Sequence, residues 1–353
     1  MKKKILISTG GSGGHVIPAT ILHEHLYEKN DIIISTDNRG FRYLDKKVYK
    51  IFLIDTPKLN LLSLPLNFFK ILFLTIKSIL FLKKEKINLI FSTGGYMSLP
   101  LILAGKFLNL KIYLLEPNLV LGKANKFFLS SCEKIFCYTK QIKKFPEKYK
   151  EKKVVIFPLV RNEFYKAKIR KINKDKFCLL IVGGSQGASF FDKNLEKIIL
   201  NISKKFSIKV IQQTNLKNIS LLKEFYSKNN IECDIFNYDK NFIDKVAETD
   251  LCITRAGATT LAELSIINVP FIAVPLPNSK DNHQFENANF YAENNACWIL
   301  DQSFVEEKIE QLIEEILSNK SNINKKIQNL NNLNFQNTWI NVNQKIVNIL
   351  DEN

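Results

Sequence analysis

Short apolar runs alternate with longer segments of helical period along the 353-residue chain. Each run ends in glycine or a small polar residue, and continuous apolar strands of this kind are typical of parallel sheets covered by helices on both faces. The pattern predicts six strands in the first half, at residues 5–9, 31–36, 87–93, 111–116, 133–137 and 153–158. It predicts six more in the second half, at residues 177–182, 208–214, 232–236, 250–254, 270–274 and 296–300.

The second half repeats the order of elements in the first. FCLLIVGGSQGASF is an apolar strand, a Gly-Gly-Ser turn and the start of a helix, about 172 residues after ILISTGGSGGH. The simplest architecture is an α/β fold of two doubly wound, Rossmann-like domains in tandem, joined near residues 159–163. Because such sheets bind ligands at the carboxyl ends of their strands, we expect the active site in a cleft between the domains.

Composition changes this picture only modestly. An apolar fraction of 46% with 24% charged residues excludes a disordered or collagen-like chain. The net charge of +17 comes almost entirely from lysine, and it permits a membrane surface, a phosphorylated substrate or nucleic acid as a partner without choosing among them. The six cysteines include no Cys-x-x-Cys pair, which favours buried free thiols. The apolar run in MKKKILIST is too short for an export signal, so we expect a first strand there.

Two glycine-rich turns follow predicted strands. GGSGGH (10–15) can bring backbone N–H groups close to an anion or a sugar, although a tight turn without a ligand has the same signature. His15 follows in the first helical turn, where it is a candidate base or hydrogen-bond donor. GGSQGA (183–188) adds Ser185 and Gln186 and suits a diphosphate, because amides and a helix dipole stabilise its charge. No Asp-x-Asp pair offers obvious ligands for a divalent metal.

Other polar residues follow further strands. Arg161, in a chain that uses lysine about nine times in ten, suggests a bidentate contact with phosphate; a surface ion pair is the alternative. TRAGATTLAEL (254–264) opens a helix whose Glu263 can accept both hydroxyls of a ribose, unless it only complements the helix dipole. Strand-end loops, where polar side chains are easily exposed, hold the remaining candidates: Tyr96, Glu116, Asn118, Asn282, His283 and Gln284.

Residues 64–86 are the most apolar part of the sequence. Lys70 and Lys77 interrupt the segment before about 18 apolar residues accumulate, so it does not predict a transmembrane helix. On a helix, Lys70, Lys77 and Lys84 fall within about 40° of one another, and Leu74 and Phe81 lie on the same face. Apolar residues among lysines favour docking on an anionic bilayer, and a crowded helix between domains is the alternative.

Seven motifs occur in order along the chain: GGSGGH, GGYMS, the Glu-x-Asn of LEPN, PLVRNEF, GGSQGA, RAGATT-LAE and NHQ. Together they strongly resemble the family-28 glycosyltransferases of peptidoglycan synthesis. Those enzymes transfer N-acetylglucosamine from UDP-N-acetylglucosamine to lipid I and form lipid II at the inner face of the cytoplasmic membrane. The resemblance extends from residue 5 to about residue 296. The family commonly has Glu-Gln-Asn where this chain has Glu116-Pro117-Asn118, and proline removes a backbone donor there.

The resemblance implies a GT-B fold. Residues 1–160 would form the acceptor and membrane-associated domain, residues 161–336 the UDP-sugar domain, and a last helix within 337–353 would pack back on the first domain. It implies a peripheral protein on the anionic cytoplasmic face of the membrane, in contact with other cell-wall synthesis proteins, without nucleic acid, metal or cofactor. Its membrane patch lies in the first domain, which favours the residues Phe73, Leu74, Lys77 and Phe81.

Site residues also follow from the resemblance by motif position. Ser12, Gly13 and Gly14 would meet the donor diphosphate and sugar, and Tyr96 would lie on the acceptor side. The rest of the donor site would consist of Arg161 and Ser185 on phosphate, Ile243 along the uracil, Ala258, Thr259, Thr260, Leu261, Ala262 and Glu263 on phosphate and ribose, and Asn118 and Gln284 on sugar hydroxyls.

The implied reaction is an inverting displacement in which the 4-hydroxyl of the muramic acid sugar attacks the anomeric carbon and UDP leaves. His15 is the first candidate for the general base and Glu116 the second. A nicotinamide-dependent oxidoreductase is a rival class, because Asp37 ends the second strand where a ribose-binding acid is expected, although GGSGGH is not G-x-G-x-x-G. A basic membrane-binding or nucleic-acid-binding module is another rival, but it leaves both glycine loops without a role.

Overall fold

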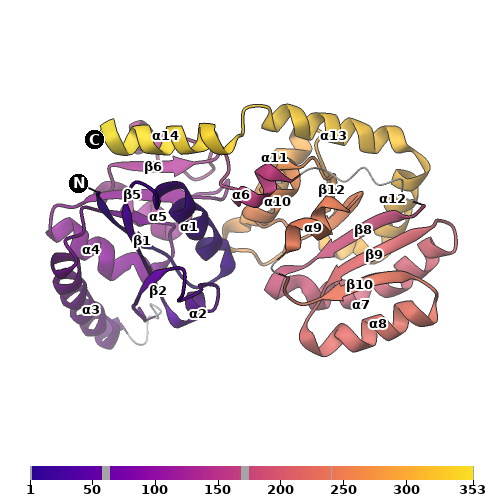
Figure 1. The fold of residues 1–353 in the computed structure, drawn as a ribbon, viewed down its shortest axis with the longest axis horizontal. Helices are drawn as coiled ribbons and strands as arrows, with labels where there is room; N and C mark the ends of the chain where they lie inside the picture. Colours follow the sequence, from indigo (N-terminus) through magenta and orange to yellow (C-terminus); the bar gives the residue numbers. More distant parts are fainter. Residues whose placement is uncertain (1, 58–63, 168–174, 240, 353) are drawn as a thin grey trace. The chain divides into compact units, whose positions relative to one another are not determined.

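The computed structural model describes residues 2–57, 64–167, 175–239 and 241–352. The chain forms two compact units, one made of Met1–Val160 with Trp339–Asn353 and the other of Arg161–Thr338. The backbone therefore passes from one unit to the other twice. Each unit is built on a parallel sheet with helices packed against it (Figure 1).

The sheet of the first unit has seven parallel strands in the order β3-β2-β1-β4-β5-β6-β7. They are β1 (Lys4–Ser8), β2 (Asp31–Thr36), β3 (Lys50–Leu53), β4 (Leu89–Ser92), β5 (Lys111–Glu116), β6 (Lys134–Cys137) and β7 (Lys153–Val155). The main helices of this unit are α1 (Gly13–Leu26), α2 (Asn38–Phe41), α3 (Leu64–Lys84), α4 (Leu99–Phe107), α5 (Lys123–Phe128) and α14 (Trp339–Glu352).

Alternate residues of β1 enter two separate cores. Ile5 and Ile7 belong to a cluster that α1 and α14 cover, whereas Leu6 belongs to a cluster that α3, α4 and α5 cover. A strand that is buried on both faces must be apolar throughout. This explains why continuous apolar runs located the strands of this unit.

The strand β3 was not predicted. It lies at the edge of the sheet and pairs only with β2. Its terminal residues Lys50 and Leu53 are exposed, and its two central residues are only partly buried. The sequence did carry a signal for it, because residues 51–54 form a continuous apolar run that sequence reasoning missed.

The sheet of the second unit has six parallel strands in the order β10-β9-β8-β11-β12-β13. They are β8 (Phe177–Val182), β9 (Ile208–Gln213), β10 (Glu232–Phe236), β11 (Leu251–Thr254), β12 (Phe271–Ala273) and β13 (Trp298–Ile299). The helices are α6 (Asn162–Lys166), α7 (Gly184–Ser203), α8 (Ile219–Lys228), α9 (Phe242–Ala247), α10 (Ala258–Ile266), α11 (His283–Glu293), α12 (Val305–Ser318) and α13 (Lys320–Asn334).

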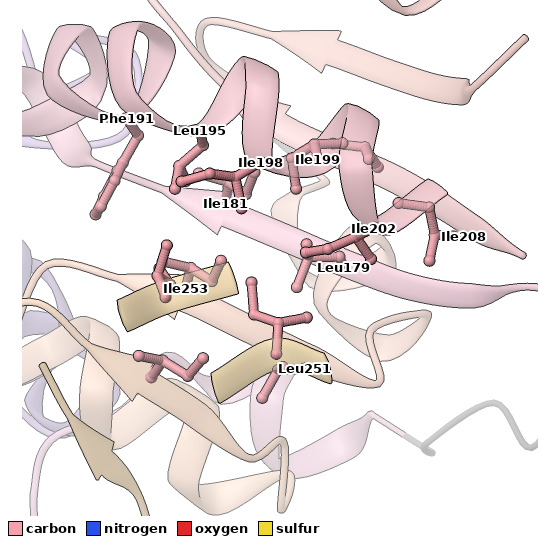
Figure 2. Close-up of a cluster of buried hydrophobic side chains, with 14 of the residues drawn as sticks. Leu179, Ile181, Phe191, Leu195, Ile198, Ile199, Ile202, Ile208, Leu251 and Ile253 are labelled. Carbon is pink, nitrogen blue, oxygen red and sulfur yellow. The ribbon is translucent and has the colours of Figure 1, made fainter. Parts of the chain in front are cut away.

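One face of this sheet is closed by α7, α8 and α12. Figure 2 shows a row of apolar side chains on α7 that points toward the strands, comprising Phe191, Leu195, Ile198, Ile199 and Ile202. The row meets residues of β8 and β11, among them Leu179, Ile181, Leu251 and Ile253. Its spacing is that of a helix with one apolar face. The start of α7 is thereby fixed beside the carboxyl end of β8.

The last helix, α14, completes the first unit. Val342, Ile346 and Leu350 are buried in the cluster that contains α1. Trp339 stacks on the ring of His25 with the ring centroids 3.6 Å apart, and the Asn343 side chain donates to the carbonyl of His25 at 2.7 Å. Residues more than 300 positions apart therefore form one surface of the unit.

All six cysteines are free thiols, as the sequence predicted. Five are buried, but Cys233 on β10 is only partly buried. β10 is the outer strand of its sheet, which explains the exposure of this side chain.

Candidate functional site

The strand order of each sheet defines where a ligand is expected. In the first unit the order reverses between β1 and β4, and in the second between β8 and β11. Ligands of doubly wound sheets bind beyond the carboxyl ends of the strands at such a switch point. All four strands at these points are followed by motifs singled out in the sequence: GGSGGH, GGYMS, GGSQGA and RAGATT.

The first glycine loop is held by a carboxylate. Gly10 and Gly11 both have positive φ, and a Cβ on Gly10 would lie 2.7 Å from Oδ1 of Asp37. The same oxygen accepts from the amides of Gly11 at 2.7 Å and of Gly40 at 2.9 Å. These glycines are therefore required for the close approach of the loop to Asp37.

Both oxygens of Asp37 are engaged within the protein. Its Oδ2 accepts from the Nε of Arg39 at 2.9 Å, and Nη2 of Arg39 also donates to the hydroxyl of Tyr96. Burial raises the pKa of Asp37, but the two backbone amides and Arg39 outweigh it and hold this pKa below its ordinary value. Asp37 organises the glycine loop, and this role explains an acid at the end of the second strand without a nicotinamide cofactor. Sequence reasoning missed Arg39, whose signal was its rarity as an arginine.

His15 lies in the first turn of α1 and is half-buried. Its Nδ1 lies 2.8 Å from the carbonyl oxygen of Thr93, in the loop after β4. A carbonyl can only accept, so Nδ1 carries the proton and Nε2 of the neutral ring holds the lone pair. The ring is thus fixed in one tautomer between the two glycine loops of the first unit.

Glu116, at the end of β5, is buried. Its Oε1 accepts from the backbone and side-chain amides of Asn118, both at 3.1 Å. Its Oε2 accepts from the amide of Gly122 at 2.8 Å and from Nδ2 of Asn125 at 2.9 Å. Four donors saturate a carboxylate. The loop forms without an N–H at Pro117, since the donors come from Asn118 onward.

The remaining predicted residues of the first unit lie around these loops. Ser12 and Gly14 are exposed and Gly13 is half-buried at the start of α1, where the first amides have no helical acceptor. Tyr96 is half-buried beside Arg39, and the Asn118 side chain contacts Glu116.

Two helix starts meet at the switch point of the second unit. Ala258, Thr259 and Thr260 form the first turn of α10 and are half-buried, and neither threonine is the N-cap. The side chains of Leu261 and Ala262 are buried in the core, which leaves only their backbone for a ligand. Ser185 and Gln186 belong to the first turn of α7, but their side chains lie outside the part that the structure describes.

Arg161 and Glu263 bind each other. The guanidinium makes a bidentate pair with the carboxylate, with Nε to Oε1 at 2.6 Å and Nη2 to Oε2 at 3.0 Å. The Cζ of Arg161 also lies 4.9 Å and 5.9 Å from the ring centroids of Phe164 and Phe242. Burial raises the pKa of Glu263, although Arg161 opposes this shift. We expected two separate contacts, to phosphate and to ribose; here the two groups satisfy each other.

Two further predicted residues are connected to this pair. One is next to a residue that contacts Arg161, and the other contacts the loop before the helix of Glu263. Ile243 is half-buried on α9, next to Phe242, which contacts Arg161. Gln284, in the first turn of α11, accepts with its Oε1 from the amides of Ala256 at 3.2 Å and Leu276 at 3.0 Å. Gln284 therefore fixes the loop that precedes α10.

Two residues of the predicted membrane face of α3 are partly buried. Leu74 and Phe81 pack against the core, and Phe81 stacks on Phe52 with centroids 3.7 Å apart. Phe73 is exposed, and Lys77 lies with its amine 6.0 Å from the Phe52 ring centroid. The exposed apolar side chains of the helix are Phe68, Phe69, Leu72, Phe73, Ile76 and Leu80. Within the described residues, no helix combines the length and hydropathy needed to cross a bilayer.

Two Rossmann-like units with glycine turns and helix starts at their switch points define a nucleotide-binding α/β protein. The family models of the glycosyltransferase family 28 N-terminal domain and C-terminal domain match residues 5–137 and 178–340. The chain belongs to glycosyltransferase family 28, and its fold class is GT-B.

Relatives and solved structures agree with this family. A protein of Pelagibacter ubique, 49% identical with 100% of both chains covered, is named UDP-N-acetylglucosamine--N-acetylmuramyl-(pentapeptide) pyrophosphoryl-undecaprenol N-acetylglucosamine transferase. A Rickettsia typhi protein of the same name is 35% identical, over 94% of this chain and 95% of its own. The crystal structure of Acinetobacter baumannii MurG superposes with a TM-score of 0.78 at 24% identity over 100% of both chains.

Proposed function

We propose that this protein transfers N-acetylglucosamine from UDP-N-acetylglucosamine to the 4-hydroxyl of the muramic acid sugar of lipid I, releasing UDP and forming lipid II. The observation that carries the proposal is the full-length similarity to the Pelagibacter ubique transferase. The geometry of both switch points supports it, because each presents groups that suit a nucleotide sugar or its acceptor.

The second unit would hold the donor. The first-turn amides of α7 and α10 suit the diphosphate. Glu263 would accept the ribose hydroxyls, and Arg161 would then turn from the carboxylate to a phosphate. Donor binding would thus exchange one bidentate pair for two contacts with the ligand. Ile243 would lie along the uracil, and Gln284 would donate to a sugar hydroxyl with its Nε2.

The first unit would supply the base and receive lipid I. His15 fits the role of base better than Glu116 does. Its Nε2 holds a lone pair because Nδ1 faces the Thr93 carbonyl, whereas every lone-pair direction of Glu116 is already used. The Nε2 would take the proton of the attacking 4-hydroxyl while UDP leaves from the opposite side of the anomeric carbon. Tyr96 and Asn118 would line the acceptor and sugar sides.

The cleft expected from the sequence stays a prediction. The inverting displacement needs the acceptor hydroxyl and the donor anomeric carbon at contact distance when both substrates bind.

We also propose peripheral docking on an anionic cytoplasmic membrane surface through α3. Its exposed residues Phe69, Phe73, Ile76 and Leu80 recur at helical spacing and form an apolar stripe. Lys70 and Lys77 are exposed on the same helix and would contact lipid headgroups. A substrate with a lipid tail would be reached from that surface, where contacts with other cell-wall synthesis proteins would also form.

The direct test is an assay of the purified chain with labelled UDP-N-acetylglucosamine and a short-chain lipid I analogue, in buffer with a chelator. We expect labelled lipid II analogue and UDP in equal amounts. UDP-glucose serves as the control donor. Absence of product together with saturable binding of a nicotinamide cofactor would overturn the proposed function.

A further inference from the structure

Arg255 is a buried arginine that the proposed reaction does not use. It follows β11 in the second unit, at the start of the loop that leads to α10, and 7% of its surface is exposed. Arginine is rare in this chain, which has 51 lysine and arginine residues together and uses arginine at only five positions. A buried arginine at a switch point is therefore a specific feature of the molecule.

The contacts of Arg255 reach three neighbouring strands and one helix. Its Nη1 donates to the carbonyl of Val274 at 3.1 Å, just after β12, and its Nη2 donates to Oε1 of Gln302 at 2.7 Å, after β13. Its own amide donates to the carbonyl of Val182 at 3.2 Å, at the end of β8. All of these contacts lie at the carboxyl edge of the sheet.

Two aromatic rings of α7 cover the guanidinium. The Cζ of Arg255 lies 4.6 Å from the ring centroid of Phe190 and 5.0 Å from that of Phe191. Phe191 is the first labelled residue of the apolar row on α7 (Figure 2), about two turns after the helix start at Gly184. The charge thus lies beside the second turn of α7, on a residue just before the start of α10, and the starts of these two helices form the predicted diphosphate site.

No carboxylate of the described residues pairs with Arg255. Its three acceptors are the neutral oxygens of Val274, Pro275 and Gln302, and its buried Nε has no hydrogen-bond partner among the described groups. Burial lowers the pKa of Arg255 to about 10. Arg161 provides the contrast, because it has a bidentate carboxylate partner.

A buried charge without a counter-charge costs free energy. A neutral side chain with N–H donors could hydrogen-bond to the same oxygens, so hydrogen bonding alone does not explain why a cation is buried here. An anion bound at the two helix starts would supply the missing counter-charge.

We propose that Arg255 is a fixed positive charge for the diphosphate of the nucleotide, acting from beneath the loop without touching the ligand. The proposal rests on the proposed function, since it assigns Arg255 to the donor site. Arg255 is on this view a positioning residue that favours a nucleoside diphosphate over an uncharged nucleoside. The part of the site that it serves is the diphosphate and not the uracil or ribose.

The test compares two ligands that differ only in the diphosphate. UDP and uridine are titrated calorimetrically into the full chain and into Arg255→Gln, Arg255→Lys and Lys209→Gln. Lys209→Gln is the matched control, because it removes a positive charge from the same unit near the amino-terminal end of β9.

We expect Arg255→Gln to weaken UDP about tenfold and to leave uridine unchanged, since a charge acts through space on the diphosphate alone. Arg255→Lys keeps the charge and should keep the ratio of the two affinities. Lys209→Gln should change neither. Unchanged uridine binding also reports that the variant is folded.

Equal loss of affinity for UDP and uridine in Arg255→Gln would overturn the proposal and leave Arg255 with a purely structural role. Loss of the preference for UDP over uridine in Arg255→Lys would also overturn the proposal. This second variant provides the test if Arg255→Gln does not fold. Failure of the parent chain to bind UDP would instead contradict the proposed function as well as the role of Arg255. The two proposals therefore fail with different results.

Discussion

His25 on α1 provides a quantitative test of the packing between α1 and α14. Its ring is buried against Trp339, and its Nε2 has no hydrogen-bond partner among the described groups. Burial lowers the pKa of His25 to about 3. In the unfolded chain the same group titrates near its ordinary value of about 6.5.

The direction of the pH effect on the free energy of unfolding follows from this difference in pKa. Because the folded-state pKa is the lower one, the unfolded chain binds a proton below about pH 6.5 that the folded chain does not. Stability from neutral His25 is present above that pH and is lost as the pH falls. Going from about pH 8 to about pH 5, this one group should lower the free energy of unfolding by about 2 kcal/mol.

The measurement uses Trp339 as the probe. Replacing Trp298, the other tryptophan of the chain, by phenylalanine leaves Trp339 fluorescence to report urea unfolding of the first unit. His25→Phe in that background keeps a ring against Trp339 but does not titrate. We expect its loss of stability between about pH 8 and about pH 5 to be smaller than the parent's by about 2 kcal/mol. Other groups cancel in this difference, and equal losses in both proteins would refute the reasoning.

Three further predictions concern the proposed activity. His15→Ala should lower turnover by at least about a hundredfold in steady-state kinetics, with little change in UDP affinity. Glu263→Ala should chiefly weaken UDP binding measured by calorimetry. An equal loss of UDP affinity in both variants would place the histidine in the donor site. Glu116→Ala should lower the melting temperature, because it leaves buried donors unpaired at about 1–3 kcal/mol each; full stability with abolished turnover would restore Glu116 as the base. Phe73→Ser should reduce cosedimentation with anionic vesicles, whereas Phe335→Ser, which alters an exposed phenylalanine of the second unit, should not; unchanged binding by Phe73→Ser would refute membrane docking through α3.

The central strands of both sheets were predictable because they are buried on both faces. Every predicted strand is present, and the edge strands β7, β10 and β13 contain short apolar runs although they are only partly buried. The strand β3 was missed although residues 51–54 form an apolar run. Loop motifs were predictable in position for the same reason, because each one follows a strand that the pattern located.

Side-chain partners were not predictable. Arg161 and Glu263 are 102 residues apart, and nothing local indicates that they pair. The four donors of Glu116 come from the loop after β5 and from Asn125 on α5. The Arg161–Glu263 pair depends on the packed fold, and the local contacts of Glu116 depend on the conformation of the chain after β5, so the spacing of residues predicts neither.

The sequence also did not predict that Leu74 and Phe81 of α3 pack inward. Leu74 and Phe81 share an arc of the helix with Lys70 and Lys77, so angle alone placed them with the lysines. A lysine extends its amine to solvent from the edge of a buried surface, whereas a neighbouring leucine or phenylalanine turns inward. Position around the helix therefore did not fix exposure at the boundary between the two environments.

The double passage of the chain between the units has a consequence for synthesis on the ribosome. Residues 161–338 are complete before α14 emerges, whereas the first unit lacks Val342, Ile346 and Leu350 until then. A nascent chain therefore finishes its second unit before its first. A premature stop shortly after residue 338 would leave the second unit complete and expose the apolar face of α1, so damage at the carboxyl end of the gene would destabilise the amino-terminal unit.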